Sequence, residues 1–334
     1  MKLIFKTGKN EGADMKKWLV NELICPECLN KDANNEISLT ADIKKETDEE
    51  IVEGRLNCPD CGRQYNINEG TAVVVPEKTL PITRHQAGYG SFSMLQSYLW
   101  SHYAEFFNGP DATDAYKKWA AAFNPRKGWA LDIGCAVGRL TFEMTKTHER
   151  AVGIDTSLSF IRSARELMAE QGLEFDLIME GEITEKKSST LDPDFEYEKA
   201  EFIVADAMAL PFRSDRFTTA SSVNILEKVP DPSLHFSEAN RVMNKTNARF
   251  LFSDPFSWDE SVSSPNLWLG GRNEGPFKGF GIDNVCRMLQ EGSGIFSPEF
   301  GIQEIGGLQW KIRKTRNLWE HITSQFVIAQ REQG

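Results

Sequence analysis

The residues of this chain best suited to ligand binding follow a short apolar stretch near position 130. Residues 129–139 read WALDIGCAVGR, in which an apolar run leads through Asp132 into a loop bracketed by Gly134 and Gly138. Helical spacing resumes over 140–146. A strand, a glycine loop and a helix start bring backbone N–H groups close to a ligand, because glycine allows tight turns and close approach. The glycine spacing differs from the G-x-G-x-x-G of dinucleotide-binding loops.

Polar side chains also end the strands predicted after this loop. Four later apolar stretches carry one at or near their ends: Asp155 in 151–155, Asp206 in 202–206, Asn224 in 219–226 and Asp254 in 250–255. Helical patterns separate these stretches, and the alternation predicts an α/β fold built on a doubly wound, mostly parallel sheet. Ligands of such sheets bind beyond the carboxyl ends of the strands. The sequence therefore predicts one shared site at that edge.

Four cysteines form two matched pairs before the α/β region. The pairs are Cys25-Pro-Glu-Cys28 and Cys58-Pro-Asp-Cys61, and each turn can place two thiolates on one tetrahedral metal. The charged stretch 42–53 between them is predicted to form a hairpin. Paired C-x-x-C motifs favour structural zinc over free thiols or a redox pair. A closed four-thiolate site leaves no open position for chemistry, so the zinc is expected to be architectural.

The glycine loop together with Asp132 and Asp155 resembles class I S-adenosylmethionine-dependent methyltransferases. The resemblance implies a Rossmann-like, seven-stranded α/β sheet and S-adenosylmethionine as the cofactor. In that family the loop passes under the methionine moiety, the acid matching Asp155 accepts both ribose hydroxyls, and the acid matching Asp206 holds the adenine amino group. The full set of residues expected at the cofactor is Asp132, Gly134, Cys135, Gly138, Asp155, Thr156, Asp206, Ala207 and Asn224. Cys135 is expected to pack there, because no base is marked as its partner.

The cysteine-bearing segment has a resemblance of its own. The text of 51–58, 62–65 and 70–76 is similar to the small zinc-ribbon proteins that activate tRNA- and protein-modifying methyltransferases. This implies a ribbon that stabilises its enzyme and a possible protein partner. The expected organisation is a zinc-ribbon domain over 18–77, a linker with lid helices over 78–125, and the methyltransferase domain over 126–334.

A narrower resemblance is carried by segments outside the cofactor loop. These are Tyr98-Leu-Trp-Ser-His-Tyr103, Glu180-Gly-Glu182, 224–232, Ser253-Asp-Pro-Phe-Ser-Trp258-Asp-Glu260 and Trp268-Leu-Gly-Gly271. They resemble the methyltransferase of ovothiol biosynthesis, which methylates an imidazole nitrogen of a mercapto-histidine. The resemblance runs from about Gly88 to the end of the chain. The family's fused sulfoxide-synthase module is absent here and a ribbon precedes the domain instead, so a selenium analogue of the substrate is also an alternative.

This resemblance implies roles for residues around the acceptor. A neutral imidazole must be aimed at the methyl group, and an acceptor at its other nitrogen would select the tautomer. Asn224, Asp254 and Tyr103 are the expected catalytic residues; Arg313, Glu227, Trp258, Trp268 and His102 are the expected substrate-binding residues. Arg313 would pair with the substrate carboxylate, or else belong to a solvated basic turn. His102 and Tyr103 lie in a predicted helix, 88–107, that closes over the site or simply packs on the domain.

Composition limits the alternatives. The 334 residues carry a net charge of −11, which argues against a nucleic-acid backbone as the main partner. We find no apolar run of membrane-spanning length, and the first residues lack a signal-peptide block. Cysteines in C-x-x-C pairs fit a reducing compartment, so a cytoplasmic protein is expected. The resemblance to the ovothiol methyltransferase implies a small-molecule, histidine-derived substrate. The alternative function is an rRNA, tRNA or protein methyltransferase with a fused zinc-ribbon activator.

Overall fold

A computed structural model describes residues 14–85, 91–109, 111–290 and 294–331. The signal-peptide expectation for the N-terminus rests mostly on residues 1–13, and the predicted helix 88–107 begins at 88–90; both stretches lie outside the described residues. No helix in the described ranges combines the length and apolar character needed to cross a membrane.

Seven strands form the centre of the protein and confirm the predicted doubly wound sheet. In spatial order they are β10 (Ala200–Ala205), β7 (Arg150–Asp155), β6 (Trp129–Ile133), β11 (Phe217–Val223), β12 (Arg249–Asp254), β14 (Trp319–Gln330) and β13 (Gly301–Arg313). The first five are mutually parallel, whereas β14 runs antiparallel to both β12 and β13. The order reverses beside β6, and such a switch point is where open α/β sheets bind ligands.

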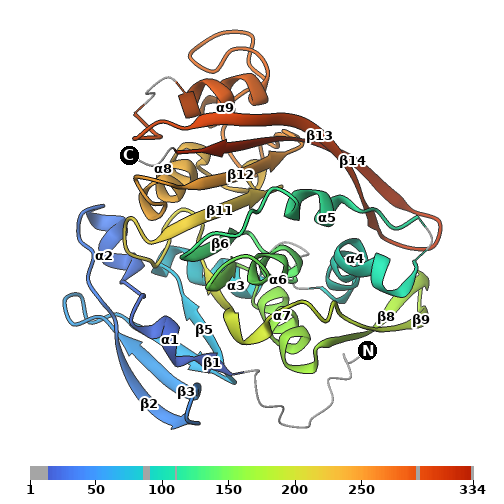
Figure 1. Ribbon diagram of the computed structural model, residues 1–334, viewed down its shortest axis with the longest axis horizontal. Coiled ribbons are helices and arrows are strands. Elements are labelled where there is room, and N and C mark those ends of the chain that lie inside the picture. The colour runs from blue at the N-terminus through green and yellow to red at the C-terminus, as the bar shows by residue number, and fades with distance from the viewer. Residues whose placement is uncertain (1–13, 86–90, 110, 291–293, 332–334) are drawn as a thin grey trace.

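Helices cover both faces of this sheet, as Figure 1 shows. They are α4 (Phe92–Tyr103), α5 (Ala115–Ala120), α6 (Arg139–Thr145), α7 (Leu158–Glu170), α8 (Pro232–Val242) and α9 (Gly281–Gln290). Alternate residues of β10 enter different cores: Ile203 packs with the core that contains α8 and α9, and Phe202 with the core that contains α4 and α7. This two-sided burial explains the nearly continuous apolar strands of the sequence.

The N-terminal strands continue the same sheet. They are β1 (Met15–Lys16), β2 (Thr40–Glu46), β3 (Glu50–Asn57), β4 (Gln64–Asn68) and β5 (Thr71–Val74), with α1 (Lys17–Val20) and α2 (Pro26–Lys31) beside them. The charged stretch 42–53 falls in the antiparallel β2–β3 hairpin. At the other edge β5 pairs in parallel with β10, with Val73 opposite Val204, and the result is one sheet of 12 strands (Figure 1).

The remaining elements surround the α4 side of the sheet or lie in its loops. They are the helix α3 (Leu80–His85), the hairpin β8 (Gly172–Glu180) and β9 (Ile183–Thr190), and the short 3₁₀ helices Glu77–Thr79, Ala104–Phe107, Tyr197–Lys199, Leu226–Lys228 and Pro265–Leu267. The hairpin spans 172–190, and Leu173, Phe175 and Leu177 bury one face of it in the core shared with α4.

Candidate active site

Two glycines give the loop after β6 its shape. Gly134 and Gly138 have φ values of +79° and +84°, a region that side chains other than glycine rarely adopt. A Cβ on Gly134 would lie 2.7 Å from Cδ1 of Ile225, and one on Gly138 would lie 2.8 Å from the ring of Phe202. The backbone therefore closely approaches β10 and the loop that follows β11, and α6 starts directly after Gly138.

Asp155, at the end of β7, is oriented by the backbone around it. Its Oδ1 accepts a hydrogen bond from Ser157 N (2.7 Å) and its Oδ2 accepts one from Ala136 N (3.1 Å) in the glycine loop. Burial raises the pKa of Asp155 to about 6, although these N–H groups act in the opposite direction. Asp155 thus connects the loop to β7 and keeps lone pairs available for a ligand's hydroxyl groups.

Asp132 is held from two elements. Its carboxylate accepts hydrogen bonds from the hydroxyls of Ser221 on β11 (2.7 Å) and Thr141 on α6 (2.8 Å). Burial raises its pKa to about 6 as well. Because both oxygens are already engaged, Asp132 braces β6 against β11 and α6 beneath the loop.

Asp206 follows β10 and joins two distant parts of the chain. Its Oδ1 accepts a hydrogen bond from Met208 N (2.8 Å), and its Oδ2 accepts one from the Thr79 hydroxyl (2.5 Å). Thr79 comes shortly after β5, whose pairing with β10 brings it to this corner.

A cavity of about 320 Å³ lies beyond the carboxyl ends of β6, β7, β10 and β11. Many residues predicted at the site line it: His102, Asp132, Gly134, Cys135, Asp155, Thr156, Asp206, Ala207 and Asn224. The loop between Gly134 and Gly138 forms part of the cavity wall through Ala136. Two loop glycines that lack a Cβ and carboxylates at two neighbouring strand ends fit a nucleoside-bearing cofactor.

Aromatic side chains from four elements line the same cavity. They are Tyr98 and His102 of α4, Tyr116 of α5, Phe160 of α7 and Trp310 of β13. The Tyr116 hydroxyl oxygen lies 2.6 Å from Nε2 of His102, and the two ring centroids are 4.1 Å apart. Nδ1 of His102 is buried and has no hydrogen-bond partner among the described residues.

The charge state of His102 follows from its surroundings. Burial and the nearby Arg139 guanidinium lower its pKa well below the ordinary value of 6.5, so the ring is neutral at physiological pH. Arg139 is itself fully buried, where it pairs with Glu105 (2.5 Å) and Glu143 (2.7 Å) and donates to the His102 carbonyl (3.0 Å). Helix α6, which begins directly after the glycine loop, thereby holds the C-terminal end of α4.

Asn224 occupies the end of β11 with a φ of +57°. Its side-chain Oδ1 accepts a hydrogen bond from the Ser324 hydroxyl of β14 (2.6 Å), and that hydroxyl oxygen accepts one from Nε1 of Trp310 (2.9 Å). These three residues form a chain of hydrogen bonds from β13 through β14 to the cavity wall.

Asp254 and Glu227, two of the predicted acids, do not line this cavity. Asp254 is fully buried and accepts hydrogen bonds from Leu226 N (3.0 Å) and Phe256 N (2.8 Å). Burial and the neighbouring Glu227 raise its pKa to about 8. Glu227 accepts a hydrogen bond from Ser257 N. The two acids thus tie the loop after β11, which carries Asn224, to the loop after β12.

The other predicted acceptor residues lie elsewhere. Tyr103 is buried under the glycine loop, where its hydroxyl donates to the Val137 carbonyl (2.8 Å). Trp258 and Trp268 stack on each other with centroids 5.9 Å apart, and Trp268 lines a separate cavity with Arg272. Arg313 ends β13, donates to the Thr315 carbonyl (3.2 Å) and lies over the ring of Trp319, outside the lining of the main cavity.

Several cavity residues escaped the sequence analysis: Thr79, Tyr116, Lys228 and Trp310. Tyr116 had only its position in the stretch 78–125, where lid helices are expected, as a signal, and Lys228 only its place after Asn224. Trp310 lies far along the chain from every motif, and the antiparallel β13–β14 hairpin brings it back to the sheet. Residue spacing carries no signal for such a contact.

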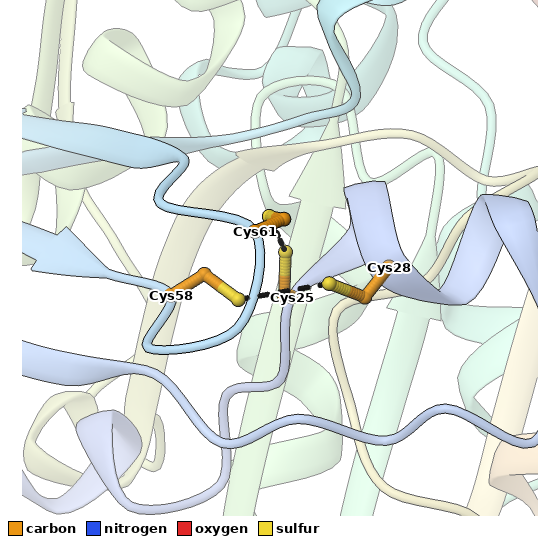
Figure 2. A group of neighbouring side chains, drawn as sticks. All are labelled: Cys25, Cys28, Cys58 and Cys61. Atoms are coloured by element: carbon orange, nitrogen blue, oxygen red, sulfur yellow. Dashed lines mark hydrogen bonds between the residues drawn. The ribbon is translucent and has the colours of Figure 1, made fainter.

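The four cysteines gather into one cluster, shown in Figure 2. Their sulfur atoms all lie within 4.8 Å of one another, with 3.6 Å between Cys25 and Cys61 and between Cys28 and Cys58. Thiolates at about 2.3 Å from a tetrahedral zinc ion lie about 3.8 Å apart, so the donor set fits that metal. Three of the cysteines are buried and Cys61 is exposed.

Comparison with known proteins agrees with this geometry. The family model described as "Methyltransferase domain" matches residues 131–250, which include the glycine loop, Asp155, Asp206 and Asn224. No curated protein matches the chain. The fold and the matched domain define this protein as an enzyme of the S-adenosylmethionine-dependent methyltransferase class.

Solved structures with the same general architecture are distant. A methyltransferase of Methanosarcina mazei is 20% identical over 64% of this chain and 97% of its own, with a TM-score of 0.41. One from Aquifex aeolicus is 12% identical over 71% of this chain and 97% of its own, also at 0.41. A complex of the Haloferax volcanii Trm112 methyltransferase activator with a candidate methyltransferase is also similar. The match is 15% identical over 71% of this chain and 97% of that chain, with a TM-score of 0.41. These likenesses carry no information about the substrate.

Proposed function

We propose that this protein methylates an imidazole nitrogen of a thiol- or selenol-bearing histidine derivative with S-adenosylmethionine. The observation that carries the proposal is the aromatic wall of Tyr98, His102, Tyr116 and Trp310 in the cavity that also contains Asp155 and Asp206. Flat aromatic faces and a neutral histidine suit a small planar heterocycle. The sequence resemblance to the ovothiol methyltransferase supports this choice.

The cofactor binds, in this proposal, along the strand ends. Asp155 accepts the ribose hydroxyls, Asp206 contacts the adenine, and the backbone at Gly134 approaches the methionine moiety. The bound cofactor supplies an electrophilic methyl group, and the protein contributes chiefly by holding the acceptor nitrogen in line with it. The closed aromatic wall excludes water from that end.

His102 selects the reactive tautomer of the acceptor. With its proton on Nε2, which donates to the Tyr116 oxygen, His102 presents Nδ1 as a hydrogen-bond acceptor. A substrate ring N–H that donates to Nδ1 leaves the lone pair of the other ring nitrogen free for the methyl group. Burial keeps the Tyr116 hydroxyl protonated because it raises the pKa of that group.

Lys228 takes the amino-acid carboxylate of the substrate. It lines the cavity, and its ammonium lies 2.8 Å from Glu227 Oε1. Arg313, the candidate from sequence, is further from this role because it lies outside the cavity lining. The remaining predicted residues would then influence the site indirectly. The loops after β11 and β12 transmit the effect of Asp254, Glu227, Trp258 and Trp268, and the glycine loop transmits that of Tyr103.

We propose structural zinc for the cysteine cluster, in a cytoplasmic protein whose ribbon can also contact a protein partner. The second candidate function follows from this part of the molecule. A zinc ribbon whose strand β5 joins the catalytic sheet fits an rRNA, tRNA or protein methyltransferase with its activator fused to it. The net charge of −11 disfavours an RNA substrate.

One experiment separates the two functions. The purified protein is incubated with S-adenosylmethionine and a mercapto-histidine, and the product is analysed by mass spectrometry. The proposal predicts the gain of one methyl group on the imidazole ring. An unchanged mercapto-histidine, together with transfer of labelled methyl to RNA or protein in a cell extract, would support the fused-activator function instead.

A further inference from the structure

The amide of Asn224 has a defined orientation, which follows from its hydrogen-bond partners. Indole is a donor only, so Trp310 Nε1–H must donate to the Ser324 oxygen at 2.9 Å. The remaining hydroxyl hydrogen of Ser324 then points to Asn224 Oδ1 at 2.6 Å. The reverse amide orientation would direct two donors at Ser324 and leave its own hydrogen without this acceptor.

The consequence concerns the cavity. With Oδ1 engaged by Ser324, the group that Asn224 has left to offer is its Nδ2 amide, which has no hydrogen-bond partner among the described residues. Asn224 lines the cavity, and Ser324 is fully buried behind it. An Nδ2 amide can donate to a lone pair but cannot accept the proton of a substrate amine or ring N–H.

We propose that Ser324 and Trp310 are positioning residues that hold Asn224 as a hydrogen-bond donor to the substrate. The atom that receives this hydrogen bond is the thiolate sulfur, or selenolate selenium, of the acceptor. The identity of that atom rests on the proposed function, whereas the orientation of the amide does not. His102 accepts from the ring N–H and Asn224 donates to the chalcogen, so the site distinguishes a thiolated imidazole from plain histidine.

The first test measures selectivity. In the presence of saturating S-adenosylhomocysteine, calorimetry gives the affinity of mercapto-histidine and of histidine for each variant. The wild type is expected to favour the thiolated ligand. Ser324→Ala should reduce that preference about tenfold, because Asn224 is no longer held as a donor and its charge-assisted hydrogen bond to the thiolate is lost. Trp310→Phe should reduce it less. Thr323→Ala, at the exposed neighbouring position of β14, is the matched control with unchanged preference.

Two results of this test would overturn the proposal. One is a Ser324→Ala variant that binds both ligands more weakly by the same factor, because Ser324 would then be only structural. The other is an equal affinity of the wild type for both ligands, which would exclude the proposed hydrogen bond from Asn224 to the sulfur.

The second test examines the orientation without any substrate. Asp shares the tolerance of Asn for positive φ, and a carboxylate still accepts from the Ser324 hydroxyl. Asn224→Asp at pH 8 should therefore melt within a few degrees of the wild type, whereas Asn224→Leu should melt lower. A large fall for Asn224→Asp, equal to that of Asn224→Leu, would contradict the orientation. If the wild type binds neither histidine ligand, the proposed substrate fails and this test still decides the orientation.

Discussion

The Thr79 hydroxyl donates a 2.5 Å hydrogen bond to Oδ2 of Asp206, across 127 positions of sequence. Thr79 follows β5, the last strand of the cysteine-bearing region, and Asp206 is the acid at the end of β10. Because β5 also pairs directly with β10, the folding of the N-terminal region and the shape of the cavity are physically connected.

Removal of the metal should weaken cofactor binding. We expect one zinc ion per chain by elemental analysis, and we expect Cys58→Ser to lose it. Loss of a structural metal should lower the melting temperature by about 5–10 °C, and the affinity for S-adenosylmethionine should fall as the β5–β10 pairing loosens. Cys286→Ser, outside the cluster, is the control. Full zinc content in Cys58→Ser would contradict the assignment.

Cofactor affinity should depend on pH through Asp155. Its pKa of about 6 lies above the ordinary value of 3.8, so the folded protein binds the proton more readily than the unfolded chain. Folding stability contributed by this carboxyl consequently declines as the pH rises from about 4 to 6. Cofactor binding needs the ionised form and should weaken as the pH falls below about 6, as titration calorimetry would show.

Asp155→Asn provides the comparison for this pH dependence. It should bind S-adenosylmethionine at least tenfold more weakly at pH 8, because one acceptor oxygen is replaced by a donor. Asp132→Asn tests the second carboxyl with a pKa of about 6. A pH profile that survives in Asp155→Asn and disappears in Asp132→Asn would assign the titration to Asp132.

Gly134→Ala should cost about 2–4 kcal/mol of unfolding free energy, from left-handed backbone strain and overpacking together. The added Cβ would lie 2.7 Å from Ile225 Cδ1. Gly181→Ala is the matched control, because Gly181 also has a positive φ of 56° but no atom within 4 Å of the added Cβ. Urea denaturation of both variants isolates the effect of the contact with Ile225. Equal losses of unfolding free energy in the two variants would show that this contact contributes nothing.

Tyr116→Phe should lower kcat about 10–100-fold and leave cofactor affinity nearly unchanged. The variant keeps the aromatic wall but removes the hydroxyl 2.6 Å from His102 Nε2. In the proposed mechanism the imidazole then loses the acceptor that holds its proton on Nε2. Steady-state kinetics with mercapto-histidine measures the effect, and calorimetry with S-adenosylhomocysteine is the control. A wild-type kcat in this variant would remove His102 from the proposed role.

The carboxylate of the substrate distinguishes Lys228 from Arg313. Lys228→Ala should raise KM for the amino-acid substrate about tenfold with little change for a decarboxylated analogue. Arg313→Ala should instead lower stability, because this side chain packs over Trp319 at the end of β13. The opposite pattern, a KM effect confined to Arg313→Ala, would return the role to the residue chosen from sequence.

The sequence by itself determined the architecture and the edge of the cavity at which Gly134, Asp155 and Asp206 lie. Strand, glycine loop and terminal acid follow one another within a few residues, and parallel strands bring their carboxyl ends to one edge. Local spacing is therefore enough to place Gly134, Asp155 and Asp206 together. The same holds for the cysteine pairs, since each turn carries two ligands.

Only the tertiary structure decided which residues form the aromatic end of the cavity. His102 of α4 meets Tyr116 of α5, and Asn224 meets Ser324 across 100 positions through the pairing of β12 with β14. Arg313, Trp258 and Trp268 are substrate-binding candidates in the sequence, but the course of β13 and the loop after β12 carries them away from the main cavity. Such contacts depend on how long-range elements pack, and residue spacing along the chain does not encode which side chains finally face one another.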